Sequence, residues 1–466
     1  MKQIIQNYKT GEIKLEEVPV PLCKAGGVLV KTVNSVISLG TERMIIDFAR
    51  KNLIGKARER PDLFRQFVDS VKRQGFITTF KEAMNRLETS VPLGSSCSGI
   101  VLEVGEGVDD FQVGDRVACA GSGFANHAEV NFVPKNLCVH IPKRQLQVDK
   151  EEKRIIKDYV SFEEAAFVNL GAIALHGVRN ANLTFGEKVG VIGLGLLGQI
   201  MVQILKGYGC EVIGIDIDKG KVALALKLGA DVGAVSGKED VSYVVHSFSK
   251  GYGLDAVIIA ASSSSAEPIQ LAAKISRERG RIVMVGVTKM EIERKIFYEK
   301  ELDFKVSRSG GPGKYDPIYE ERGIDYPIGY TRWTLRRNME EFLNLIAKGK
   351  IKLEKIITHR VGTEEVVETY RNILGGHKRF IGIVISYPDT FRLDKKVYLK
   401  KNKAIPLSKE KIGVGVIGAG LFGRSILLPA LKNISLISLK AIASATGTSA
   451  KTLGDKFGFE YATSNY

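Results

Sequence analysis

Hydrophobic and polar residues alternate along most of residues 1–44 and again along 98–141, and β-branched residues are frequent in both stretches. Alternation with a period of two is typical of strands that bury one face. These stretches therefore predict a β domain. Over residues 45–88, between them, apolar residues recur at helical spacing, which predicts two or three amphipathic helices inserted into that domain.

From about residue 160 the pattern changes to short, almost wholly apolar runs separated by helical segments. The runs predicted as strands are 188–194, 211–217, 255–261, 280–287 and 303–309. Strands that are apolar on both faces and alternate with helices are typical of a parallel sheet covered on both sides. The predicted fold class is therefore α/β, with a β domain followed by a doubly wound parallel sheet.

These patterns divide the chain into five segments. A β domain with its helical insert (1–160) precedes a nucleotide-binding sheet (161–309), and the chain then returns to the β domain (310–390). Residues 391–410 form a lysine-rich linker. Residues 411–466 open a second strand–glycine–helix unit. Because a doubly wound sheet needs several more strands, we expect this last unit to be truncated and the chain to be a fragment of a longer protein. Packing of this tail on a partner is the alternative.

The composition of the 466 residues is that of an ordinary globular protein, with 44% hydrophobic and 26% charged residues. No apolar run approaches the roughly 18 residues needed to cross a bilayer. Five scattered cysteines without a C-x-x-C pair argue against a disulfide scaffold and suit a reducing cytoplasm. The net charge of +16 is compatible with an anionic partner. No nucleic-acid-binding motif accompanies this charge, so we expect neither a nucleic-acid partner nor membrane insertion.

A glycine-rich motif directly follows the first strand of the predicted parallel sheet. It consists of Gly193, Leu194, Gly195, Leu196, Leu197 and Gly198. In dinucleotide-binding folds the first glycine allows a tight turn, the second admits the pyrophosphate and the third packs the helix against the strand. Asp216 ends the next strand about 20 residues downstream, where an acid accepts hydrogen bonds from the ribose hydroxyls. Because this carboxylate would repel a 2′-phosphate, the expected cofactor is NAD.

Three weaker candidates belong to the same predicted site. Lys221 lies five residues beyond Asp216, within reach of the adenosine ribose. Ser262 and Val287 follow two other predicted strands, and the carboxyl ends of such strands form the ligand-binding edge of an open parallel sheet.

A second glycine motif, with Gly418, Gly420 and Gly423, opens the C-terminal unit. No acid follows its next predicted strand. Two interpretations remain open: a site that takes NADP or contacts the ribose in another way, and a purely structural turn.

Residues 1–390 resemble the medium-chain alcohol dehydrogenases, in which a GroES-like β domain precedes a Rossmann domain. The resemblance is carried by SGIVLEVGEGVDDFQVGDRV, HAEVNFVP, FEEAAFVNLGAIALHGV and GVIGLGLLGQ. From residue 411 the chain is similar to the start of the Gfo/Idh/MocA oxidoreductases. With SLGTER and GGPGKYDPIYEERGIDYPIGYTRW, the whole looks like the bi-domain oxidoreductases of bacterial surface-polysaccharide gene clusters.

This resemblance implies hydride transfer between NAD and a CH–OH or C=O group of a sugar or nucleotide sugar. It also implies a homo-oligomer. A non-catalytic dinucleotide-binding module, whose chemistry lies in a missing C-terminal part, is the alternative.

The resemblance also identifies the positions at which zinc members of the family hold their metal. Here these positions carry Ser38, Ser95 and Leu170, and Gly94-Ser95-Ser96 stands where the family has Gly-His-Glu. Zinc needs thiolate, imidazole or carboxylate ligands, so we expect no zinc. The reaction would then need another means of stabilising and removing the hydroxyl proton.

Four residues of the β domain are candidates for that task, because the resemblance places their segments along the cleft. We expect the hydroxyl group of Ser38, Thr41 or Ser95 to orient the substrate oxygen, and Glu42 to accept its proton. For each of them, capping of a turn is the structural alternative. Three other reactive side chains are interpreted more readily as structural than as catalytic: Cys97, His127 and His176.

The loop 310–333 concentrates aromatic and basic side chains, among them Tyr315, Tyr330 and Arg332. Aromatic rings beside guanidinium groups suit a sugar or the diphosphate of a nucleotide sugar. These three residues are therefore the candidate substrate contacts, with an ordered structural loop or a subunit contact as the alternative.

Overall fold

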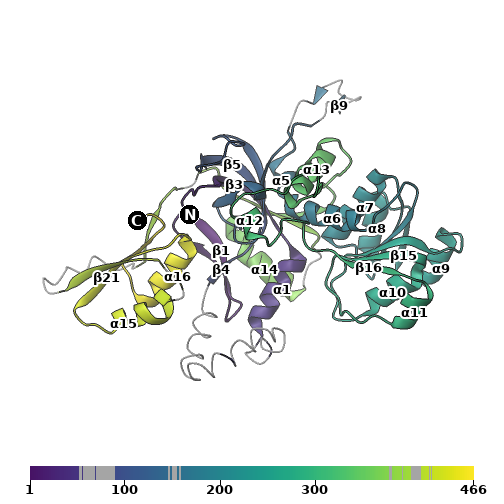
Figure 1. The fold of residues 1–466 in the computed structure, drawn as a ribbon. Helices are drawn as coiled ribbons and strands as arrows, with labels where there is room; N and C mark the ends of the chain where they lie inside the picture. Colours follow the sequence, from purple (N-terminus) through teal and green to yellow (C-terminus); the bar gives the residue numbers. More distant parts are fainter. Residues whose placement is uncertain are drawn as a thin grey trace.

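The computed structural model describes residues 1–51, 55, 69, 90–144, 147–148, 155–156, 159–376, 380–390, 392–399, 411–418, 420 and 422–466. Most of the predicted helical insert therefore lies outside the described residues. Figure 1 shows three bodies in a row: a C-terminal unit (yellow), a β domain in the centre and a nucleotide-binding domain (teal). The predicted α/β fold, with a GroES-like β domain and a parallel Rossmann-type sheet, is confirmed.

The β domain contains two mostly antiparallel sheets. The larger sheet has the order β17-β18-β3-β5-β6-β8, with β7 paired to β3. Its strands are β3 (Gly27–Ile37), β5 (Ser96–Val104), β6 (Arg116–Ala120), β7 (Val130–Pro134), β8 (Cys138–His140), β17 (Ile357–Gly362) and β18 (Gly382–Ser386). The smaller sheet, of order β2-β1-β4, has the strands β1 (Lys2–Asn7), β2 (Ile13–Glu17) and β4 (Ser90–Pro92). A short hairpin pairs β9 (Gln147–Val148) with β10 (Ile155–Ile156).

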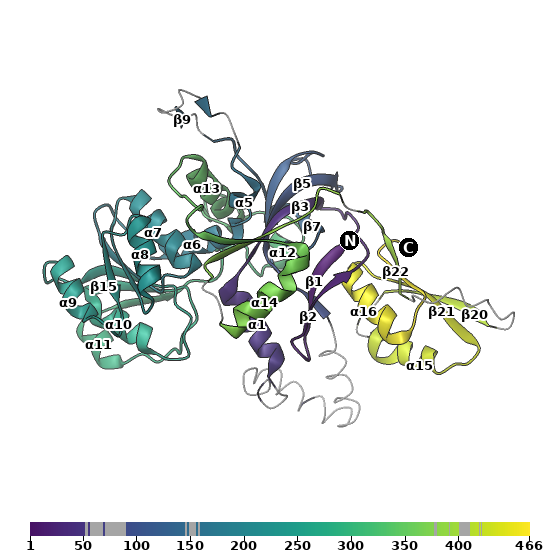
Figure 2. The same cartoon turned by 180° about the vertical axis from the view of Figure 1, so that it is seen from behind.

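Several helices complete this domain and connect it to its neighbour. They are α1 (Leu39–Arg50), α5 (Phe162–Ala165), α6 (Val168–Asn180), α12 (Pro317–Glu320), α13 (Leu335–Ala347) and α14 (Val366–Gly375), with 3-10 turns at Lys135–Leu137 and Thr363–Glu365. Figures 1 and 2 both place α1 next to α14 between the β domain and the nucleotide-binding domain. No helix of the described residues is long and apolar enough to cross a bilayer.

The nucleotide-binding domain is a parallel sheet of order β13-β12-β11-β14-β15-β16. Its strands are β11 (Lys188–Ile192), β12 (Glu211–Asp216), β13 (Val232–Val235), β14 (Leu254–Ile259), β15 (Ser276–Met284) and β16 (Asp303–Val306), and its helices are α7 (Leu196–Tyr208), α8 (Lys219–Lys227), α9 (Val241–Phe248), α10 (Glu267–Ile275) and α11 (Arg294–Glu299). The strand order reverses between β11 and β14, and ligands of such sheets bind at that switch point.

Strand β14 shows why the sequence reads as continuously apolar here. Val257 and Ile259 enter one hydrophobic core, whereas Ile258 enters the core on the opposite face. Both faces are buried under helices, so no polar alternation is left for the sequence to display.

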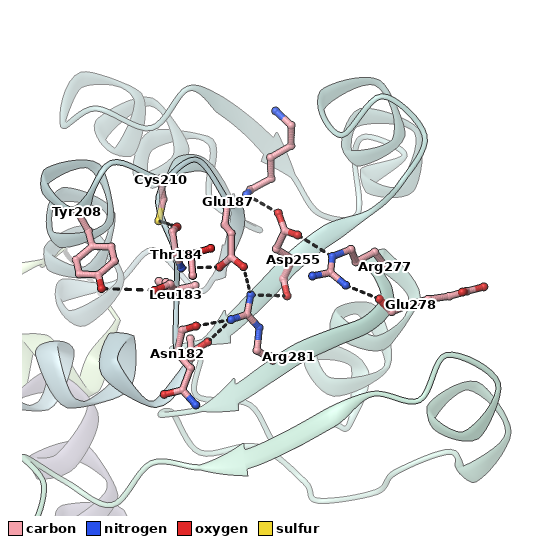
Figure 3. A network of polar contacts seen from close by, with 12 residues as sticks. Asn182, Leu183, Thr184, Glu187, Tyr208, Cys210, Asp255, Arg277, Glu278 and Arg281 are labelled. Atoms are coloured by element: carbon pink, nitrogen blue, oxygen red, sulfur yellow. Dashed lines mark hydrogen bonds and ion pairs between the residues drawn. The ribbon is translucent and has the colours of Figure 1, made fainter.

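A polar network lies at the amino edge of this sheet, where its strands begin, opposite the switch point (Figure 3). Arg281 donates to the carbonyl of Asn182 at 2.5 Å and to a carboxylate oxygen of Glu187 at 2.6 Å. Asp255 accepts from Arg277 at 2.6 Å and from the backbone N–H of Lys188 at 2.8 Å. The network ties the starts of neighbouring strands to the turn after α6.

The C-terminal unit has a four-stranded sheet of order β19-β22-β21-β20 within the described residues. Its elements are β19 (Lys396–Tyr398), β20 (Ile412–Ile417), a π-helical turn (Gly423–Leu427), α15 (Leu428–Lys432), β21 (Ile437–Ala443), α16 (Gly447–Phe457) and β22 (Tyr461–Thr463). Helix α16 begins against the N-terminal segment of the β domain. There Thr448 contacts Gln3 at 2.5 Å, and a Cβ added to Gly447 would meet the carbonyl of Pro19 at 2.1 Å.

The start of the first helix differs from the sequence prediction. Helix α1 begins at Leu39, not near residue 45. The backbone N–H of Glu42 donates to the carbonyl of Ser38 at 2.9 Å, which is the first helical bond, and the Glu42 side chain accepts from the N–H of Ser38 at 3.0 Å. These two bonds start the helix directly after β3.

Candidate functional site

A cleft of about 960 Å³ lies between the nucleotide-binding sheet and the β domain. The glycine motif and the carboxyl ends of β11, β12 and β14 form one wall. The opposite wall carries Ser38 and three residues of α1 or just beyond it, Arg43, Asp47 and Lys51, together with Ile373 of α14. The cleft thus covers the switch point of the parallel sheet.

The three glycines of the motif meet different neighbours. Gly193 has a φ of +93°, and a Cβ added to it would lie 2.5 Å from the backbone nitrogen of Ala261. A Cβ on Gly198 would lie 2.0 Å from the carbonyl oxygen of Gly193. Gly195 differs, because it lines the cleft and a Cβ there would have no protein atom within 4 Å. Its lack of a side chain therefore leaves space in the cleft for a ligand.

Asp216 stands beside this motif at the end of β12. One carboxylate oxygen accepts from the backbone N–H of Leu194 at 2.7 Å, and the other accepts from that of Asp218 at 2.9 Å. The ammonium group of Lys221 lies 3.8 Å from the first oxygen. Asp216 and Lys221 line the cleft together, so the structure brings the two predicted ribose contacts to one place.

The remaining predicted cofactor residues lie around the same edge. Leu196, Leu197 and Ser262 line the cleft, whereas Leu194 is buried. Val287 forms a parallel bridge with Ser262 but is 53% exposed and does not line the cleft.

These residues fit a bound dinucleotide. Helix α7 has no side-chain cap at its N-terminus, so its first N–H groups are available to an anion. Gly195 would admit the pyrophosphate to these groups, and Asp216 would face the adenosine ribose.

Of the two described hydroxyl candidates, Ser38 lines the β-domain side of the cleft, beside Leu170, and Ser95 does not. The hydroxyl of Ser95 accepts a hydrogen bond from the side-chain amide of Asn169 at 3.1 Å, and Asn169 is the residue before Leu170. The third hydroxyl candidate is Thr41, and its side chain lies outside the described residues.

Glu42 does not line the cleft. Its side chain is buried, and its carboxylate contacts the backbone N–H of Ser38 at 3.0 Å, the ring nitrogen Nε2 of His127 at 3.3 Å and the hydroxyl of Tyr370. Burial and the neighbouring carboxylate raise the pKa of Tyr370 well above its usual value. In this arrangement Glu42 therefore does not reach a substrate in the cleft.

The residues at the family's metal positions do not fit zinc. Ser38, Ser95 and Leu170 supply two hydroxyl groups and an alkyl chain, and neighbouring Asn169 adds an amide. None of these is a thiolate, imidazole or carboxylate. In the part of the chain that the structure describes, no group of three His, Cys, Asp or Glu side chains has a metal-binding arrangement.

The three predicted substrate residues of the loop 310–333 do not line this cleft. Arg332 lies over the ring of Trp333 at 3.8 Å, and Arg179 lies over the same ring at 3.4 Å. Tyr315 is positioned beside two basic side chains, and Tyr330 is 93% exposed. The loop thus pairs aromatic and basic groups as its composition indicates, but its three candidate residues stand outside the lining of the cleft.

The second glycine motif lies in the C-terminal unit, away from the cleft lining. Gly418 has a φ of +96°, and neither it nor Gly420 would bring a Cβ within 4 Å of a neighbour. A Cβ on Gly423 would lie 3.4 Å from the carbonyl of Gly418, so this turn is looser than the first.

The sequence predictions missed Arg43, Asp47 and Lys51, which line the cleft at intervals of four residues along α1 and just beyond its end. That spacing is visible in the sequence once the helix is known to begin at Leu39. They also missed Asn169. The sequence signal that could have identified it is its place directly before Leu170, which stands at one of the family's metal positions.

The chain matches two family models. One, described as an alcohol dehydrogenase GroES-like domain, matches residues 69–143, and the other, described as a zinc-binding dehydrogenase, matches residues 197–321. Neither reaches the C-terminal unit.

Among curated proteins, the chain is similar to the D-arabitol-phosphate dehydrogenase of Enterococcus avium. The two are 28% identical over 333 residues, which is 68% of this chain and 87% of the relative.

Among solved structures, the chain is similar to the galactitol-1-phosphate dehydrogenase of Escherichia coli, with 19% identity and a TM-score of 0.61 over 83% of this chain and all of that one. It is also similar to an alcohol dehydrogenase of E. coli CFT073 solved with NADH, with 19% identity and a TM-score of 0.59 over 83% and 99% of the two chains. At these identities the structures show a shared fold.

Proposed function

We propose that this chain, which is similar to the medium-chain, zinc-type alcohol dehydrogenases, is an NAD-dependent oxidoreductase that works without zinc. The proposed substrate is a polyol, a sugar or a phosphorylated or nucleotide-linked form of either, as in the polyol-phosphate dehydrogenases that it resembles. The observation that carries the proposal is the pairing of Gly195 and Asp216 on one wall of the cleft with Ser38 on the other.

NAD, when bound, would accept the hydride from the substrate carbon. The chain's own residues would then have two tasks, to hold the dinucleotide and to hold the substrate oxygen. Gly195 and the first amides of α7 suit the pyrophosphate, and Asp216 favours NAD over NADP because it would repel a 2′-phosphate.

We assign the orientation of the substrate oxygen to the hydroxyl groups of Ser38 and Ser95. Asn169 supports this, because its amide holds the Ser95 hydroxyl at 3.1 Å. Glu42 is not assigned the role of proton acceptor, since its carboxylate accepts from the backbone N–H of Ser38 and does not line the cleft. We expect Ser95→Ala to lower kcat by about tenfold or more, as loss of a positioned hydrogen bond does.

The test of the coenzyme assignment is a fluorescence titration with NADH and NADPH. Wild type is expected to bind NADH more tightly, and Asp216→Ala to weaken NADH binding by about tenfold, as for loss of a hydrogen bond to a charged group. Reduction of NAD at 340 nm with D-arabitol, D-arabitol phosphate and galactitol 1-phosphate then tests turnover. NADH binding without turnover of any sugar or polyol would favour the non-catalytic module.

The zinc assignment has a separate test. Protein purified without chelators and then dialysed against EDTA should retain its rate, and metal analysis before dialysis should find far less than one zinc per chain. About one tightly held zinc per chain, with activity lost on its removal, would contradict the assignment.

The C-terminal unit enters the proposal on the resemblance alone. We propose that residues 411–466 correspond to the start of a Gfo/Idh/MocA domain, with NADP as the candidate ligand of its glycine motif, and that the chain forms a homo-oligomer. A titration with NADPH in which Gly420→Val removes a second binding event would support the second site.

A further inference from the structure

Helix α1 has two faces with different neighbours. Glu42, Ile46 and Ala49 recur at intervals of four and three residues and are 3%, 1% and 0% exposed, so they form the face that packs into the β domain. Arg43 and Asp47 lie on the face that lines the cleft. A charged residue therefore occupies a position on the core-facing stripe where an apolar residue would be expected.

Both oxygens of the Glu42 carboxylate accept hydrogen bonds from protein groups. Its oxygen Oε1 accepts from the backbone N–H of Ser38 at 3.0 Å and from Nε2 of His127 at 3.3 Å. Its oxygen Oε2 accepts from the hydroxyl of Tyr370 on α14. His127 and Tyr370 are 0% and 1% exposed. Because a carboxylate can only accept, both side chains must act as donors here.

The same carboxylate joins the parts of the β domain that form its cleft wall. Ser38 lines the cleft, α1 contributes Arg43 and Asp47 to it, and α14 contributes Ile373. Apolar packing alone leaves a helix free to rotate or slide slightly, whereas a buried carboxylate with three donors in different directions permits one placement. A donor left unpaired in the core costs free energy, so other placements of α1 are disfavoured.

We propose that Glu42 is a positioning residue, which through Ser38, His127 and Tyr370 fixes α1 against α14 and so sets the substrate side of the cleft. The inference rests on the proposed function for the identity of that cleft. It does not make Glu42 a catalytic residue, since its carboxylate touches protein groups alone among the described contacts.

The chain offers a matched pair of variants for the test. Tyr370→Phe removes the hydroxyl that contacts Glu42. Tyr319→Phe removes another fully buried hydroxyl, which accepts from the backbone N–H of Arg336 at 3.1 Å and contacts neither α1 nor Glu42 among the described contacts. Both changes keep the ring, so general loss of packing is the same in each.

Two measurements follow for both variants. Hydrogen exchange of peptides covering α1 should become about tenfold faster in Tyr370→Phe, as for loss of one hydrogen bond to a charged group, and stay unchanged in Tyr319→Phe. With a substrate that wild type turns over, KM should rise by about tenfold in Tyr370→Phe alone, while the NADH dissociation constant stays within about twofold. Glu42→Gln, which keeps one acceptor oxygen, should change both measurements in the same direction.

Equal exchange of α1 in the two tyrosine variants, or a lowered melting temperature in Tyr370→Phe with unchanged exchange and KM, would overturn the proposal. If wild type turns over none of the polyols, the proposed function fails, but the exchange comparison still decides whether Glu42 positions α1. The two failures are therefore distinguishable.

Discussion

Gly195 and Gly198 belong to one motif but lack a side chain for different reasons. At Gly195 a methyl group would enter the cleft without touching protein, and its φ of −70° is open to any residue. At Gly198 a methyl group would collide with the carbonyl of Gly193. One glycine serves the ligand and the other serves the packing of α7 on its loop.

We therefore expect opposite phenotypes from two alanine substitutions. Gly195→Ala should keep the melting temperature of wild type but weaken NADH binding by about tenfold or more, because the added methyl group occupies ligand space. Gly198→Ala should lower the melting temperature, since backbone must move to admit the methyl group. Thermal denaturation and NADH titration on both variants check this, and a destabilised Gly195→Ala would contradict it.

His176 provides a second prediction, on pH. Burial first, and then the charges of Lys305 and Arg179, lower the pKa of His176 to about 4 from the value of about 6.5 expected in the unfolded chain. Between these values the unfolded chain binds a proton that the folded chain does not, so His176 destabilises the fold as pH falls from about 6.5 to 4.

His176→Gln should make the melting temperature fall less steeply with pH over that range. His140→Gln, at an exposed histidine, is the control. Parallel curves for wild type and His176→Gln between pH 4.5 and 6.5 would count against this assignment.

At the scale of residues, the sequence predicted the cofactor wall better than the substrate wall. The spacing of Gly193, Gly195 and Asp216 is tied to one strand–turn–helix geometry, so the motif fixes their relative places. The role of Glu42 depends on which way α1 is rotated and on donors from residues 127 and 370, far away in the sequence. No local pattern contains that information.

At the scale of elements, the parallel sheet was predictable because each strand is apolar on both faces. Strand β17 was not predicted, since only its first residue is buried and polar side chains interrupt it. The start of α1 was placed too late because Glu42 breaks the apolar periodicity of the core-facing stripe. The irregularity that hid the helix boundary is the feature that anchors the helix.

The network at the amino edge of the sheet (Figure 3) predicts a stability effect without a functional one. The side chains of Arg281 and Glu187 are 18% and 15% exposed, and Arg281 also holds the carbonyls after α6. Arg281→Gln should lower the free energy of unfolding by about 2 kcal/mol, because it leaves a partly buried carboxylate without its partner.

Arg279→Gln is the matched control, since Arg279 and Glu301 form an ion pair of similar length that is 76% and 71% exposed. Exposed pairs of this kind contribute about 0–1 kcal/mol. Urea denaturation measures both variants, and NADH titration should show no change in either, because the network lies at the edge opposite the cleft. Equal destabilisation by the two substitutions would argue against a role for burial.

At the scale of the whole molecule, the nucleotide-binding domain and the C-terminal unit lie on opposite sides of the β domain (Figures 1 and 2), and the cleft lies on the side of the nucleotide-binding domain. The unit is attached through its own polar contacts: the carbonyl of Asp394 accepts from the N–H of Val20 at 3.1 Å, and Thr448 contacts Gln3. None of these residues lines the cleft. Solved relatives whose whole length matches 83% of this chain have the same fold of β domain and Rossmann sheet.

These observations predict that the C-terminal unit supports stability but not the binding of NADH in the cleft. A chain shortened after residue 390 should bind NADH within about twofold of the full chain, because sites far apart act independently. Its melting temperature should fall, since the buried backbone of Val20 loses its hydrogen bonds with the carbonyl of Asp394 and the hydroxyl of Ser464. Gly447→Val, which would force a side chain against Pro19, should produce the same pair of results in the full-length chain. If either variant remains folded by circular dichroism but loses NADH binding, the cleft depends on the C-terminal unit and the prediction is wrong.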